Sequence, residues 1–456
     1  MRSLERSAGL RPRLRELRLV RFAYAGAVVA RVLLGYKLLA LQKGRWSPEK
    51  YEERLSARHL RSARWIYDGV LRLQGLMIKI GQTLGSRPDM LPEEYIRVLS
   101  PLQDQVPPRP FNKMRPHIER ELGARLGDVF SEFNAEPVAA ASLAQVYRAR
   151  LKNGRDVAVK VVYPGIERLV DTDLRILKAL IWIESRIDPQ PVEPIYRELA
   201  ANIPFEVDMI HEGESMEALA SLLSHRQEIV IPGVIWEHTR KRVLTMEYID
   251  GIKITDLPRL AQAGTDIDEL FRLVADVYCE QMLRHGHFQA DPHPGNLLAL
   301  PGNRLAILDF GLTKRFTPEF QAAFKAMTRA IFSGDGEGTE EAMKAAGFAF
   351  RREGADGFLA IGELFRGAAD PNTYRDPELL KAIYDGSLRT TKQNPLVDMP
   401  GEITLALRVV GLVMGLVVTS KADVDFGQAL LRYAEESPDD TSRVASTRGR
   451  LPGGVE

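Results

Sequence analysis

Three polar residues in the second half of the chain have types and spacing suited to phosphate chemistry. Asp291 is followed five residues later by Asn296, and Asp309 opens an Asp-Phe-Gly triplet after a short apolar stretch. Carboxylate and amide oxygens are hard ligands of the kind that Mg²⁺ prefers. Transfer of a phosphoryl group needs such a cation, because the group carries several negative charges. We therefore predict that Asn296 and Asp309 bind magnesium and that Asp291 orients or deprotonates an incoming hydroxyl group or water.

A lysine upstream is placed to bind phosphates. Lys160 ends the apolar, β-rich stretch Val-Ala-Val-Lys. A lysine that points out of a strand can reach the α- and β-phosphates of a nucleotide when a glutamate from a helix fixes it. We expect that helix to begin near Pro204, and it carries Glu206, Asp208 and Glu212. Glu212 is the predicted partner of Lys160, and the alternative is an ordinary lysine at a strand end.

The segment where a phosphate-binding loop belongs lacks the usual glycines. Residues 137–145 read Pro-Val-Ala-Ala-Ala-Ser-Leu-Ala-Gln. Alanine restricts the backbone and prevents the close approach that glycine permits. We predict that Ala139, Ala140, Ala141 and Ser142 contact the phosphates with a different geometry, which would alter nucleotide preference or transfer ability. An ordinary alanine-rich turn is the alternative.

A short segment resembles the hinge that binds adenine in kinases. It reads Thr-Met-Glu-Tyr-Ile-Asp-Gly over residues 245–251. Backbone groups of Glu247 and Ile249 are predicted to face the adenine ring, with Met246 at the back wall of the pocket. The residue types carry little specificity here, because backbone atoms do the binding.

These residues require a small sheet followed by a mostly helical region. Strands are predicted at 146–150, 156–162, 228–231, 234–237 and 242–247, with a strand pair around 297–308. An Asn-Gly pair at 153–154 predicts the turn of a hairpin. Helices are predicted at 63–84, from Pro92, at 112–122, at 260–284 and over nearly all of 318–436.

The composition is that of an ordinary globular chain. Its 456 residues include 62 Lys and Arg against 61 Asp and Glu, with 27% charged and 45% apolar residues. These values exclude a mostly disordered chain, a collagen-like repeat and a protein with many membrane spans. A net charge of +1 gives no sign of a nucleic-acid binder. The single cysteine, Cys279, excludes an internal disulfide and a cysteine-based zinc site. The spacing of His285, His287 and His293 fits no familiar metal-ligand set.

The charge is distributed unevenly along the chain. Residues 1–46 carry 11 Lys and Arg against Glu5 and Glu16, so this basic lead has a net charge of +9 and the other 410 residues have −8. No compact apolar core with a small-residue cleavage site follows the first arginines, so we expect no cleavable signal peptide. A basic lead of this kind predicts an anchor for an anionic lipid surface.

Two apolar stretches bear on membrane attachment. Leu19–Leu41 contains Arg21, Arg31 and Lys37, which are too many cations for a comfortable spanning helix. We predict an amphipathic helix that either lies on a membrane surface or packs on its own protein, and the sequence favours neither. The run 403–418 has 16 residues, so we predict a buried helix too short to cross a bilayer.

Taken together, the motifs resemble the UbiB/AarF/ADCK family of atypical kinase-like proteins, also called the ABC-one family. The resemblance covers about residues 60–435, and its motifs occur in the family's order. The segments that carry it are Leu73-Gln74-Gly75-Leu76, Lys79-Ile80-Gly81-Gln82, Ser86-Arg87-Pro88-Asp89-Met90-Leu91-Pro92, Leu102-Gln103-Asp104-Gln105-Val106-Pro107-Pro108, Ala139-Ala140-Ala141-Ser142, Val157-Ala158-Val159-Lys160, Pro164-Gly165-Ile166, Glu206-Val207-Asp208, Phe288-Gln289-Ala290-Asp291-Pro292-His293-Pro294-Gly295-Asn296 and Asp309-Phe310-Gly311.

The resemblance implies an α+β, protein-kinase-like two-lobed fold with an N-terminal helical extension packed across the active site. It implies that Lys79 and Gln82, in the K-x-G-Q lid, cover the nucleotide and that Glu206 and Asp208 hold Lys79. Such a lid would occupy the path of a protein substrate and restrain phosphoryl transfer. The family is therefore better described as ATPase-like, with roles in isoprenoid-lipid and quinone biology. No Ala-Pro-Glu signature follows Asp309-Phe-Gly, which agrees with that view.

Two positions depart from the family pattern. Gln289 stands where the family commonly has His, and Gly213 stands where Ala is usual. A glycine inside a helix weakens it by about 1 kcal/mol relative to alanine. Neither change removes a predicted phosphate or metal ligand, so nucleotide binding is still expected.

We expect five segments along the chain. They are a basic amphipathic helical lead at 1–60, a helical K-x-G-Q extension at 61–135, a kinase-like N-lobe at 136–250, a largely helical C-lobe at 251–436 and a disordered tail at 437–456.

The function that these features predict is an ATP-binding, magnesium-dependent kinase-like ATPase, cytoplasmic and peripherally attached to a membrane. Its expected partners are ATP or ADP, an isoprenoid lipid or quinone precursor, an anionic membrane surface and enzymes of quinone biosynthesis, with no nucleic acid. Two alternatives stay open: a phosphotransferase that acts on a protein or small molecule, and a nucleotide-gated scaffold without catalysis.

Overall fold

The computed structural model describes residues 18–85, 91–103, 106–184, 193–352, 356–370 and 400–436, with a few positions between 372 and 398. Within these residues the chain divides into two compact units. The first unit takes in the described residues up to Gly213 together with Val234–Tyr248. The second takes in Glu214–Gly233 and the described residues from Ile249 onward. Parts of the predicted lead, of two family motifs (86–90 and 104–105) and the whole predicted tail lie outside the described residues. The five-segment division stays a prediction.

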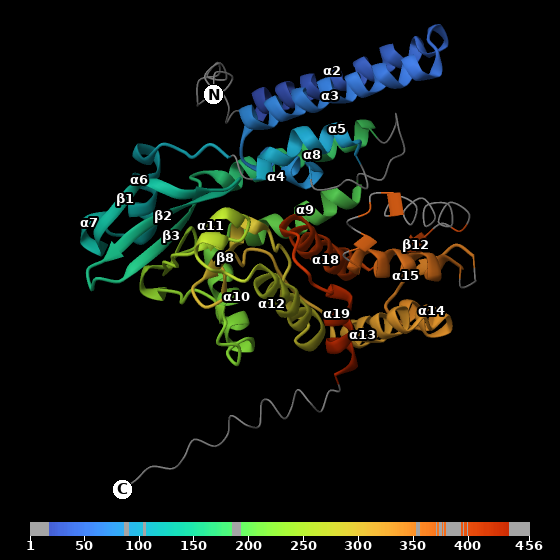
Figure 1. Ribbon diagram of the computed structural model, residues 1–456. Helices are drawn as coiled ribbons and strands as arrows, with labels where there is room; N and C mark the ends of the chain where they lie inside the picture. The colour runs from blue at the N-terminus through green and yellow to red at the C-terminus, as the bar shows by residue number, and fades with distance from the viewer. Residues whose placement is uncertain are drawn as a thin grey trace. The chain divides into compact units, whose positions relative to one another are not determined.

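The first unit combines a helical N-terminal region with a small sheet (Figure 1). Its elements are α2 (Arg18–Leu41), η2 (Lys43–Arg45), α3 (Pro48–Leu73), α4 (Leu76–Gly85), α5 (Glu93–Leu99), η3 (Ser100–Gln103), α6 (Phe111–Leu122), α7 (Leu126–Val129), β1 (Phe130–Ala140), β2 (Ala144–Leu151), β3 (Asp156–Val162), α8 (Ile166–Glu184), α9 (Glu193–Glu206), η4 (Trp236–His238) and β5 (Val243–Glu247).

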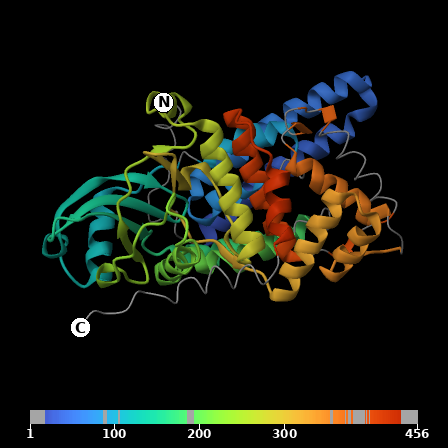
Figure 2. The ribbon, with the colours of Figure 1, turned by 60° about the horizontal axis from the view of Figure 1, so that its bottom comes forward.

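The second unit is mostly helical, and Figure 2 shows α12 and α18 running side by side within it. Its elements are α10 (Met209–Leu222), whose first turns belong to the first unit, β4 (Ile229–Val230), β6 (Ile252–Lys253), α11 (Leu257–Gln262), α12 (Ile267–Cys279), η5 (Glu280–Arg284), β7 (His287–Gln289), η6 (Pro294–Asn296), β8 (Leu297–Leu300), β9 (Arg304–Ile307), β10 (Thr313–Arg315), α13 (Pro318–Ser333), α14 (Gly336–Ala345), β11 (Ala349–Phe350), α15 (Asp356–Ala369), β12 (Leu396–Asp398), α18 (Gly401–Ser420) and α19 (Phe426–Glu435).

The sheet of the first unit has the order β1-β2-β3-β5, with antiparallel neighbours. The predicted β2–β3 hairpin is confirmed, and Gly154 adopts a φ of 86° in its turn. Strand β1 was not predicted, because most of its side chains are exposed and its pairing with β2 contains register shifts. The predicted strand at 234–237 is wrong: Val234 makes a single bridge to Met246, and the one-turn helix η4 follows.

The predicted helix at 63–84 is two helices. Helix α3 ends at Leu73 and α4 begins at Leu76, because Gln74 and Gly75 have φ values of 56° and 63°. A positive φ at two successive residues turns the chain out of the helix. The core of this region is made by buried side chains of α3, α4, α5 and the segment that follows, namely Ala63, Val70, Ile78, Tyr95, Leu99, Leu102 and Val106.

Gly81 permits the close packing of α4 in this core. A Cβ built at Gly81 would lie 2.6 Å from Cδ1 of Leu102 and 3.2 Å from Cγ1 of Val70. The glycine of the K-x-G-Q segment therefore makes room for neighbouring side chains rather than for another backbone.

The predicted helix start at Pro204 is wrong. Pro204 lies inside α9, which ends at Glu206, and α10 begins at Met209. Asp208 between the two helices caps α10, since its Oδ1 accepts hydrogen bonds from the backbone N–H groups of Ile210 and His211 at 3.1 and 3.4 Å. The break therefore places Glu206 and Glu212 on different helices.

The predicted helix at 260–284 is divided as well. Gly264, with a φ of 72°, separates α11 from α12, and the last five residues form the π-helical turn η5. Helix α18 has 20 residues, so the predicted length of 16 was too short. Its predicted burial is confirmed by the side chains Ile403, Ala406, Val409, Val410, Val413, Met414, Leu416 and Val417.

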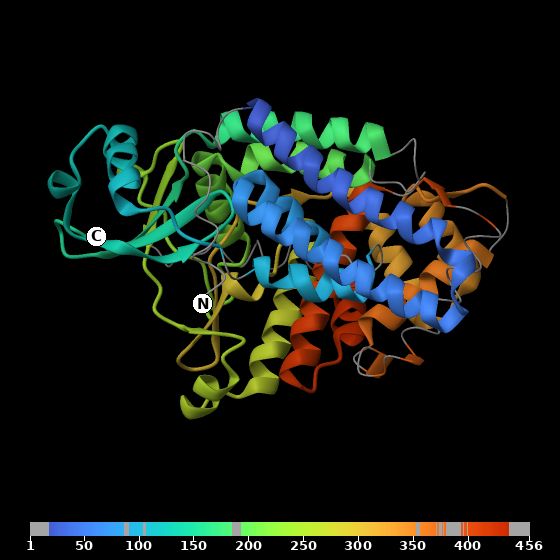
Figure 3. The ribbon, with the colours of Figure 1, turned by 90° about the horizontal axis from the view of Figure 1, so that it is seen from above.

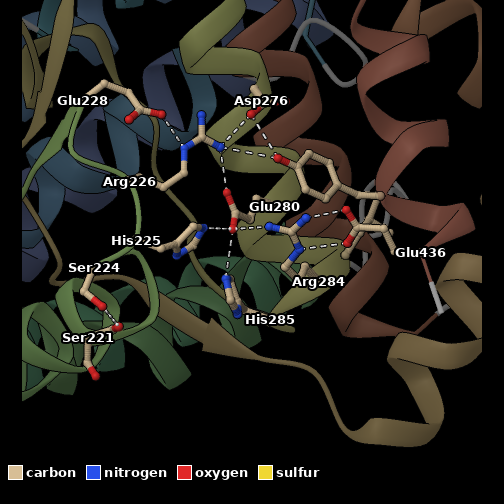
Figure 4. A network of polar contacts seen from close by, with 12 residues as sticks. Ser221, Ser224, His225, Arg226, Glu228, Asp276, Glu280, Arg284, His285 and Glu436 are labelled. Carbon is tan, nitrogen blue, oxygen red and sulfur yellow. Dashed lines mark hydrogen bonds and ion pairs between the residues drawn. The ribbon is translucent and has the colours of Figure 1, made fainter. Parts of the chain in front are cut away.

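A network of charged residues holds η5 in the second unit (Figure 4). The Glu280 carboxylate is fully buried and lies within 2.7 Å of nitrogens of both Arg226 and Arg284. His225 and His285 also approach it, at 2.8 and 3.2 Å. Burial alone would raise the pKa of Glu280, but hydrogen bonds from His285 and Arg226 and the charges of Arg284 and Arg226 lower it to about 2. Glu280 is therefore a charged anchor for this turn.

Helix α2 packs along α3, as Figure 3 shows, and is fixed to the first unit by one buried ion pair. Arg21 donates to the two carboxylate oxygens of Asp173 in α8 at 2.8 and 2.6 Å. Both of these side chains are at most 1% exposed. Arg21 Nη1 also donates to the backbone oxygen of Leu73 at 2.6 Å, where α3 ends. The first cation of the apolar stretch thus points into the protein.

Within the described residues, α2 and α18 are long and apolar enough to cross a membrane by length and composition. In the most apolar window of α2 only 17% of the residues are buried, against 44% in α18.

We predict that Arg21→Met lowers the free energy of unfolding of the first unit by about 3–5 kcal/mol, because it leaves the Asp173 carboxylate buried without its partner. All four tryptophans belong to the first unit, so urea unfolding followed by tryptophan fluorescence reports on it. The double variant Arg21→Met/Asp173→Leu should recover most of the loss. Arg175→Met, which breaks an exposed pair on the same helix, is the control and should change stability by less than about 1 kcal/mol. An equal effect of Arg21→Met and Arg175→Met would contradict a structural role for the buried pair.

Candidate functional site

The predicted site residues form two sets, one in each compact unit. In the first unit, Lys160 on β3 pairs with Glu212 on α10, with Nζ and Oε1 2.6 Å apart. The Lys160 side chain is 11% exposed and the Glu212 side chain is fully buried. Burying a charge without a partner is costly, so the two groups hold each other in place. The predicted pairing is present. The role of this pair in binding phosphates stays a prediction.

The glycine beside Glu212 makes room for a tryptophan. A Cβ built at Gly213 would lie 2.8 Å from Cη2 of Trp236, closer than side-chain carbons approach one another. The indole of η4 therefore packs directly on the α10 backbone, one residue after Glu212. The sequence showed Gly213 only as a weak point in the helix, whereas the structure gives it a packing role.

The alanine-rich turn is tied down by a tyrosine. The backbone N–H of Ala141 donates to the Ala144 oxygen at 2.8 Å and closes the turn. The Tyr163 hydroxyl donates to the Ala141 oxygen at 3.1 Å, and the Tyr163 N–H donates to the Leu143 oxygen at 2.9 Å. Apart from Gln74, Asn303 and Lys421, all described non-glycine residues have negative φ, so the turn needs no glycine.

Its predicted phosphate contacts differ in exposure. Ala139 and Ala141 are exposed, Ala140 is half-buried and Ser142 is buried. The contact of these residues with phosphates stays a prediction.

The K-x-G-Q residues are held by neighbours within the first unit. Lys79 Nζ lies 2.8 Å from Glu206 Oε1, and both side chains are about 15% exposed. Gln82 Nε2 donates to the backbone oxygen of Leu102 at 2.9 Å. Asp208, expected beside Glu206 as a second holder of Lys79, caps α10 and lies 4.0 Å from the Lys241 ammonium. The lid function of Lys79 and Gln82 stays a prediction.

The predicted hinge coincides with a division point of the two units, between Tyr248 and Ile249. Glu247 ends β5, and its exposed carboxylate pairs with Arg155 at 2.9 Å. Ile249 packs against the cluster of Leu298, Leu300 and Ala306 in the second unit. The side chains of both residues are thus engaged within their own units, and adenine binding by their backbone groups stays a prediction.

The second set lies in loops beside short strands of the second unit. Asp291 follows β7, and Asp309 precedes β10, which pairs antiparallel with β7. Asn296 ends η6, and its Nδ2 donates to the backbone oxygen of Asp291 at 3.4 Å. Asp309 Oδ1 accepts the N–H of Gly311 at 3.0 Å. The structure thus brings the three motif residues to one place, while their catalytic and metal-binding roles stay predictions.

A buried glutamine lies between the two aspartates. Gln289, at the end of β7, donates from Nε2 to the backbone oxygens of Asp291 and Asp309 at 2.6 and 3.2 Å. Its Oε1 accepts the Asp291 N–H at 3.2 Å and the Tyr278 hydroxyl at 2.9 Å. Burial raises the pKa of Tyr278 well above its usual value, and the charges of Asp291 and Asp309 raise it further. Tyr278 is therefore a protonated hydrogen-bond donor.

An arginine from α18 reaches the predicted base. Arg408 Nη2 lies 3.1 Å from Asp291 Oδ1, and about a quarter of each side chain is exposed. A guanidinium group at this position fixes the orientation of the carboxylate. Partial exposure leaves both groups accessible to a ligand.

The donor set fits magnesium. Asp309 offers carboxylate oxygen, and the bond from Asn296 Nδ2 to Asp291 turns the Asn296 side-chain oxygen to the other side, where it can serve as a ligand. Among the described residues no group of three or more His, Cys, Asp and Glu could hold a metal ion. A pair of protein oxygens agrees with magnesium chemistry, because Mg²⁺ is commonly bound by one or two protein ligands together with phosphates and water.

The histidines and the cysteine near this set are structural. His285 pairs with Glu280, and burial, with smaller effects from Arg315 and His285, lowers the pKa of His287 to about 4. His293 Nδ1 accepts the Gly295 N–H at 3.2 Å and shapes the loop before Asn296. Cys279 is fully buried in α12, and burial raises its pKa well above the usual value, as expected of a core residue.

Comparison with known proteins identifies the family. The sequence model of the ABC1 atypical kinase-like domain matches residues 101–343, which is more than half of the chain. The chain belongs to this family. The match contains Lys160, Glu212, Asp291, Asn296 and Asp309, so the fold class and the predicted resemblance are confirmed.

Related proteins carry kinase names. An Arabidopsis thaliana protein named ACTIVITY OF BC1 COMPLEX KINASE 8, chloroplastic, is 38% identical over 304 residues, which are 65% of this chain and 40% of that protein. The Xenopus laevis AarF domain-containing protein kinase 1 is 35% identical over 295 residues, which are 63% of this chain and 57% of that protein. The matched region thus spans well under two thirds of either relative.

A solved structure shares the fold. Rv3197 from Mycobacterium tuberculosis, solved as a complex with erythromycin, has a TM-score of 0.56 and 23% sequence identity. The likeness covers 86% of this chain and all of that chain. It supports the ABC1 kinase-like fold.

Two residues of the second set were not predicted as part of the site. Arg408 is the charged residue within an apolar run, and a charge in such a run is a signal that could have identified it. Gln289 is visible in the sequence only as a departure from His. Its four hydrogen bonds depend on how β7, α12 and the Asp309 loop meet, and no local pattern shows that.

We predict that Gly213→Ala destabilises the first unit by about 1–3 kcal/mol, because its Cβ would displace the Trp236 ring. Helix propensity alone predicts the opposite, a gain of about 1 kcal/mol. Urea unfolding followed by tryptophan fluorescence decides between them. In the background Trp236→Leu the same substitution should become neutral or stabilising. A stabilising Gly213→Ala in the parent chain would show that the ring yields without cost.

Proposed function

We propose that this protein binds ATP with magnesium and hydrolyses it, as an atypical kinase-like ATPase. The observation that carries the proposal is the pair of Lys160 and Glu212, 2.6 Å apart and almost wholly buried. An ammonium group fixed in this way on a strand is suited to the α- and β-phosphates of a nucleotide. Membership of the ABC1 family and the kinase names of its relatives support the same chemistry.

Each polar residue has a role in this proposal. Asp309 and Asn296 hold magnesium, which neutralises charge on the phosphates when it is bound. Asp291 orients a water and accepts its proton as the water oxygen bonds to the γ-phosphorus, and the bond from that phosphorus to the ADP oxygen breaks. The products are ADP and inorganic phosphate, and the proton passes from Asp291 to solvent. Arg408 keeps the Asp291 carboxylate turned toward the site.

Hydrolysis is proposed rather than transfer to a protein for two reasons. The sequence after Asp309-Phe-Gly lacks the Ala-Pro-Glu signature of peptide-docking kinases. The Lys79–Glu206 pair also ties α4, which carries the lid residues, to the end of α9. A phosphotransferase would instead show transfer of labelled phosphate to an acceptor, and a scaffold would bind nucleotide without turnover.

We predict that Asp309→Asn lowers magnesium-dependent ATP hydrolysis by about 100-fold or more, since a metal-binding charge contributes several kcal/mol to such a transition state. The measurement is phosphate release at saturating ATP over a magnesium titration. Asp335→Asn is the matched control, because Asp335 also accepts a backbone N–H in the second unit but lies in the cap of α14. If Asp309→Asn hydrolyses ATP like the parent, Asp309 is not a magnesium ligand in turnover.

We further propose that the protein works at an anionic membrane surface in the biosynthesis of isoprenoid lipids or quinones. The surface is supported by the outward side chains of α2, where Leu19, Leu34, Leu38 and Leu41 are 57–84% exposed. Residues 18–73 carry 12 Lys and Arg against four acidic residues, a net charge of +8. Apolar side chains flanked by cations are typical of helices that lie in a lipid interface.

Two further contacts fit an interfacial position. Arg31 on α2 stacks on Trp65 of α3 at 4.0 Å, and Arg54 on α3 stacks on Trp46, which lies between η2 and α3, at 3.7 Å. Aromatic rings beside cations are typical of membrane interfaces. Arg21, buried against Asp173, ties the first turns of α2 to the first unit. We therefore propose that α2 lies on the membrane and does not cross it. The lipid class rests on the family resemblance, and identification of lipids extracted from the purified protein would test it.

We predict that Leu34→Asn/Leu38→Asn weakens binding to anionic vesicles by at least about tenfold, because two leucines leave the lipid. Vesicle co-sedimentation measures the effect, with zwitterionic vesicles as the charge control. Leu359→Asn, which changes a 37% exposed leucine on α15, should bind like the parent. Unchanged vesicle binding by the double variant would show that the membrane contact lies elsewhere. The double variant should hydrolyse ATP like the parent in the absence of vesicles.

A further inference from the structure

The Gln289 side chain connects the two segments of the second set through backbone atoms. It is 1% exposed, and all four hydrogen-bonding positions of its amide are used. Both Nε2 hydrogens are donated, to the backbone oxygens of Asp291 and Asp309. Both acceptor positions of Oε1 are filled, by the Asp291 N–H and the Tyr278 hydroxyl. A buried amide with no unused position has a single favourable orientation.

We propose that Gln289 is a positioning residue that sets the spacing between the catalytic Asp291 and the metal ligand Asp309. It touches neither magnesium nor nucleotide in this assignment and acts only through the backbones of the two aspartates. For its effect on turnover, the inference rests on the function proposed above.

The geometry explains why an amide suits this position. One planar group must donate to two backbone oxygens, one two residues away at Asp291 and one twenty residues away at Asp309, and must also accept from two donors. Glutamate has the same shape and no donor when ionised, so it would face two backbone oxygens with negative charge. A neutral histidine has one donor and one acceptor, so it can make at most two of the four hydrogen bonds.

Neighbouring residues of η5 and α12 fix the position and orientation of the Gln289 amide. The Gln289 backbone N–H donates to Gln281 Oε1 in η5 at 3.0 Å. The Tyr278 hydroxyl approaches from α12 and donates to Oε1, while the Asp291 N–H, which can only donate, sets which end of the amide is Oε1. An exchange of the two ends of the amide would set its NH₂ group against the Asp291 N–H and leave both backbone oxygens without a donor. The orientation that bridges the aspartates is therefore the favoured one.

The test compares Gln289→Glu, Gln289→His and Tyr278→Phe with the parent chain. Gln321→Glu is a matched control, because Gln321 Nε2 also bridges two backbone oxygens of the second unit, those of Leu283 and Arg284, at 2.8 and 3.1 Å. For each chain the measurements are the magnesium concentration at half-maximal hydrolysis, kcat at saturating magnesium, ATP binding in EDTA and the melting temperature.

We expect Gln289→Glu to raise the half-maximal magnesium concentration and to lower kcat, each by about tenfold, since misplaced ligands bind the metal and orient water less well. Gln289→His should recover part of the loss, and Tyr278→Phe should show a smaller shift in the same direction. ATP binding in EDTA should be unchanged. Gln321→Glu should lower the melting temperature without changing the magnesium dependence.

Three outcomes decide the matter. A magnesium dependence like that of the parent in Gln289→His and Tyr278→Phe would overturn the inference while leaving the proposed function intact. The same shift in Gln321→Glu would also overturn it, because the effect would then come from lost stability. If the parent itself shows no magnesium-dependent hydrolysis, the proposed function fails. The inference is then decided by whether the Gln289 variants lose the parent's magnesium-dependent rise in melting temperature with ATP.

Discussion

A charge buried without a partner is costlier than almost any other local error in a protein, and this constraint organises the chain. The Lys160 side chain on β3 can be buried because Glu212 on α10 pairs with it. Arg21 of α2 can be buried because Asp173 on α8 pairs with it. Glu280 is fully buried because Arg226 and Arg284 surround it. Except for Glu280–Arg284 within η5, these pairs join segments that are distant in sequence, so they help to fix which segments meet.

The sequence could predict the features that depend on local chemistry. The β2–β3 hairpin follows from an Asn-Gly turn between apolar strands, and the Lys160–Glu212 pair follows from a strand-end lysine that needs a helical glutamate. The motif at Asp291, Asn296 and Asp309 was visible because Asn296 and Asp309 flank one short hairpin, β8–β9, and Asp291 lies five residues before Asn296. In all three cases the decisive residues lie near one another in the chain or belong to a recognised order of motifs.

Features that depend on packing between distant segments could not be predicted. Periodicity runs through Gln74 and Gly75, and only the backbone shows that α3 ends there. Gly213 looks like a weak point in a helix until Trp236 is seen against it. Pro204 suits a helix start, yet α9 already runs through it and ends at Glu206. A local preference is outweighed wherever a neighbouring segment occupies the same space.

The π-helical turn η5 shows how these constraints reach the candidate site. A π-turn inserts one extra residue into a helix and so changes the direction of the side chains that follow. In η5, Glu280 faces the charged network, while the next residue, Gln281, accepts the backbone N–H of Gln289. The charge network thus holds the turn, the turn holds the end of β7, and Gln289 at that end holds the backbones of Asp291 and Asp309. Glu280, which is not among the predicted metal ligands, is connected in this way to the geometry of the predicted catalytic loop.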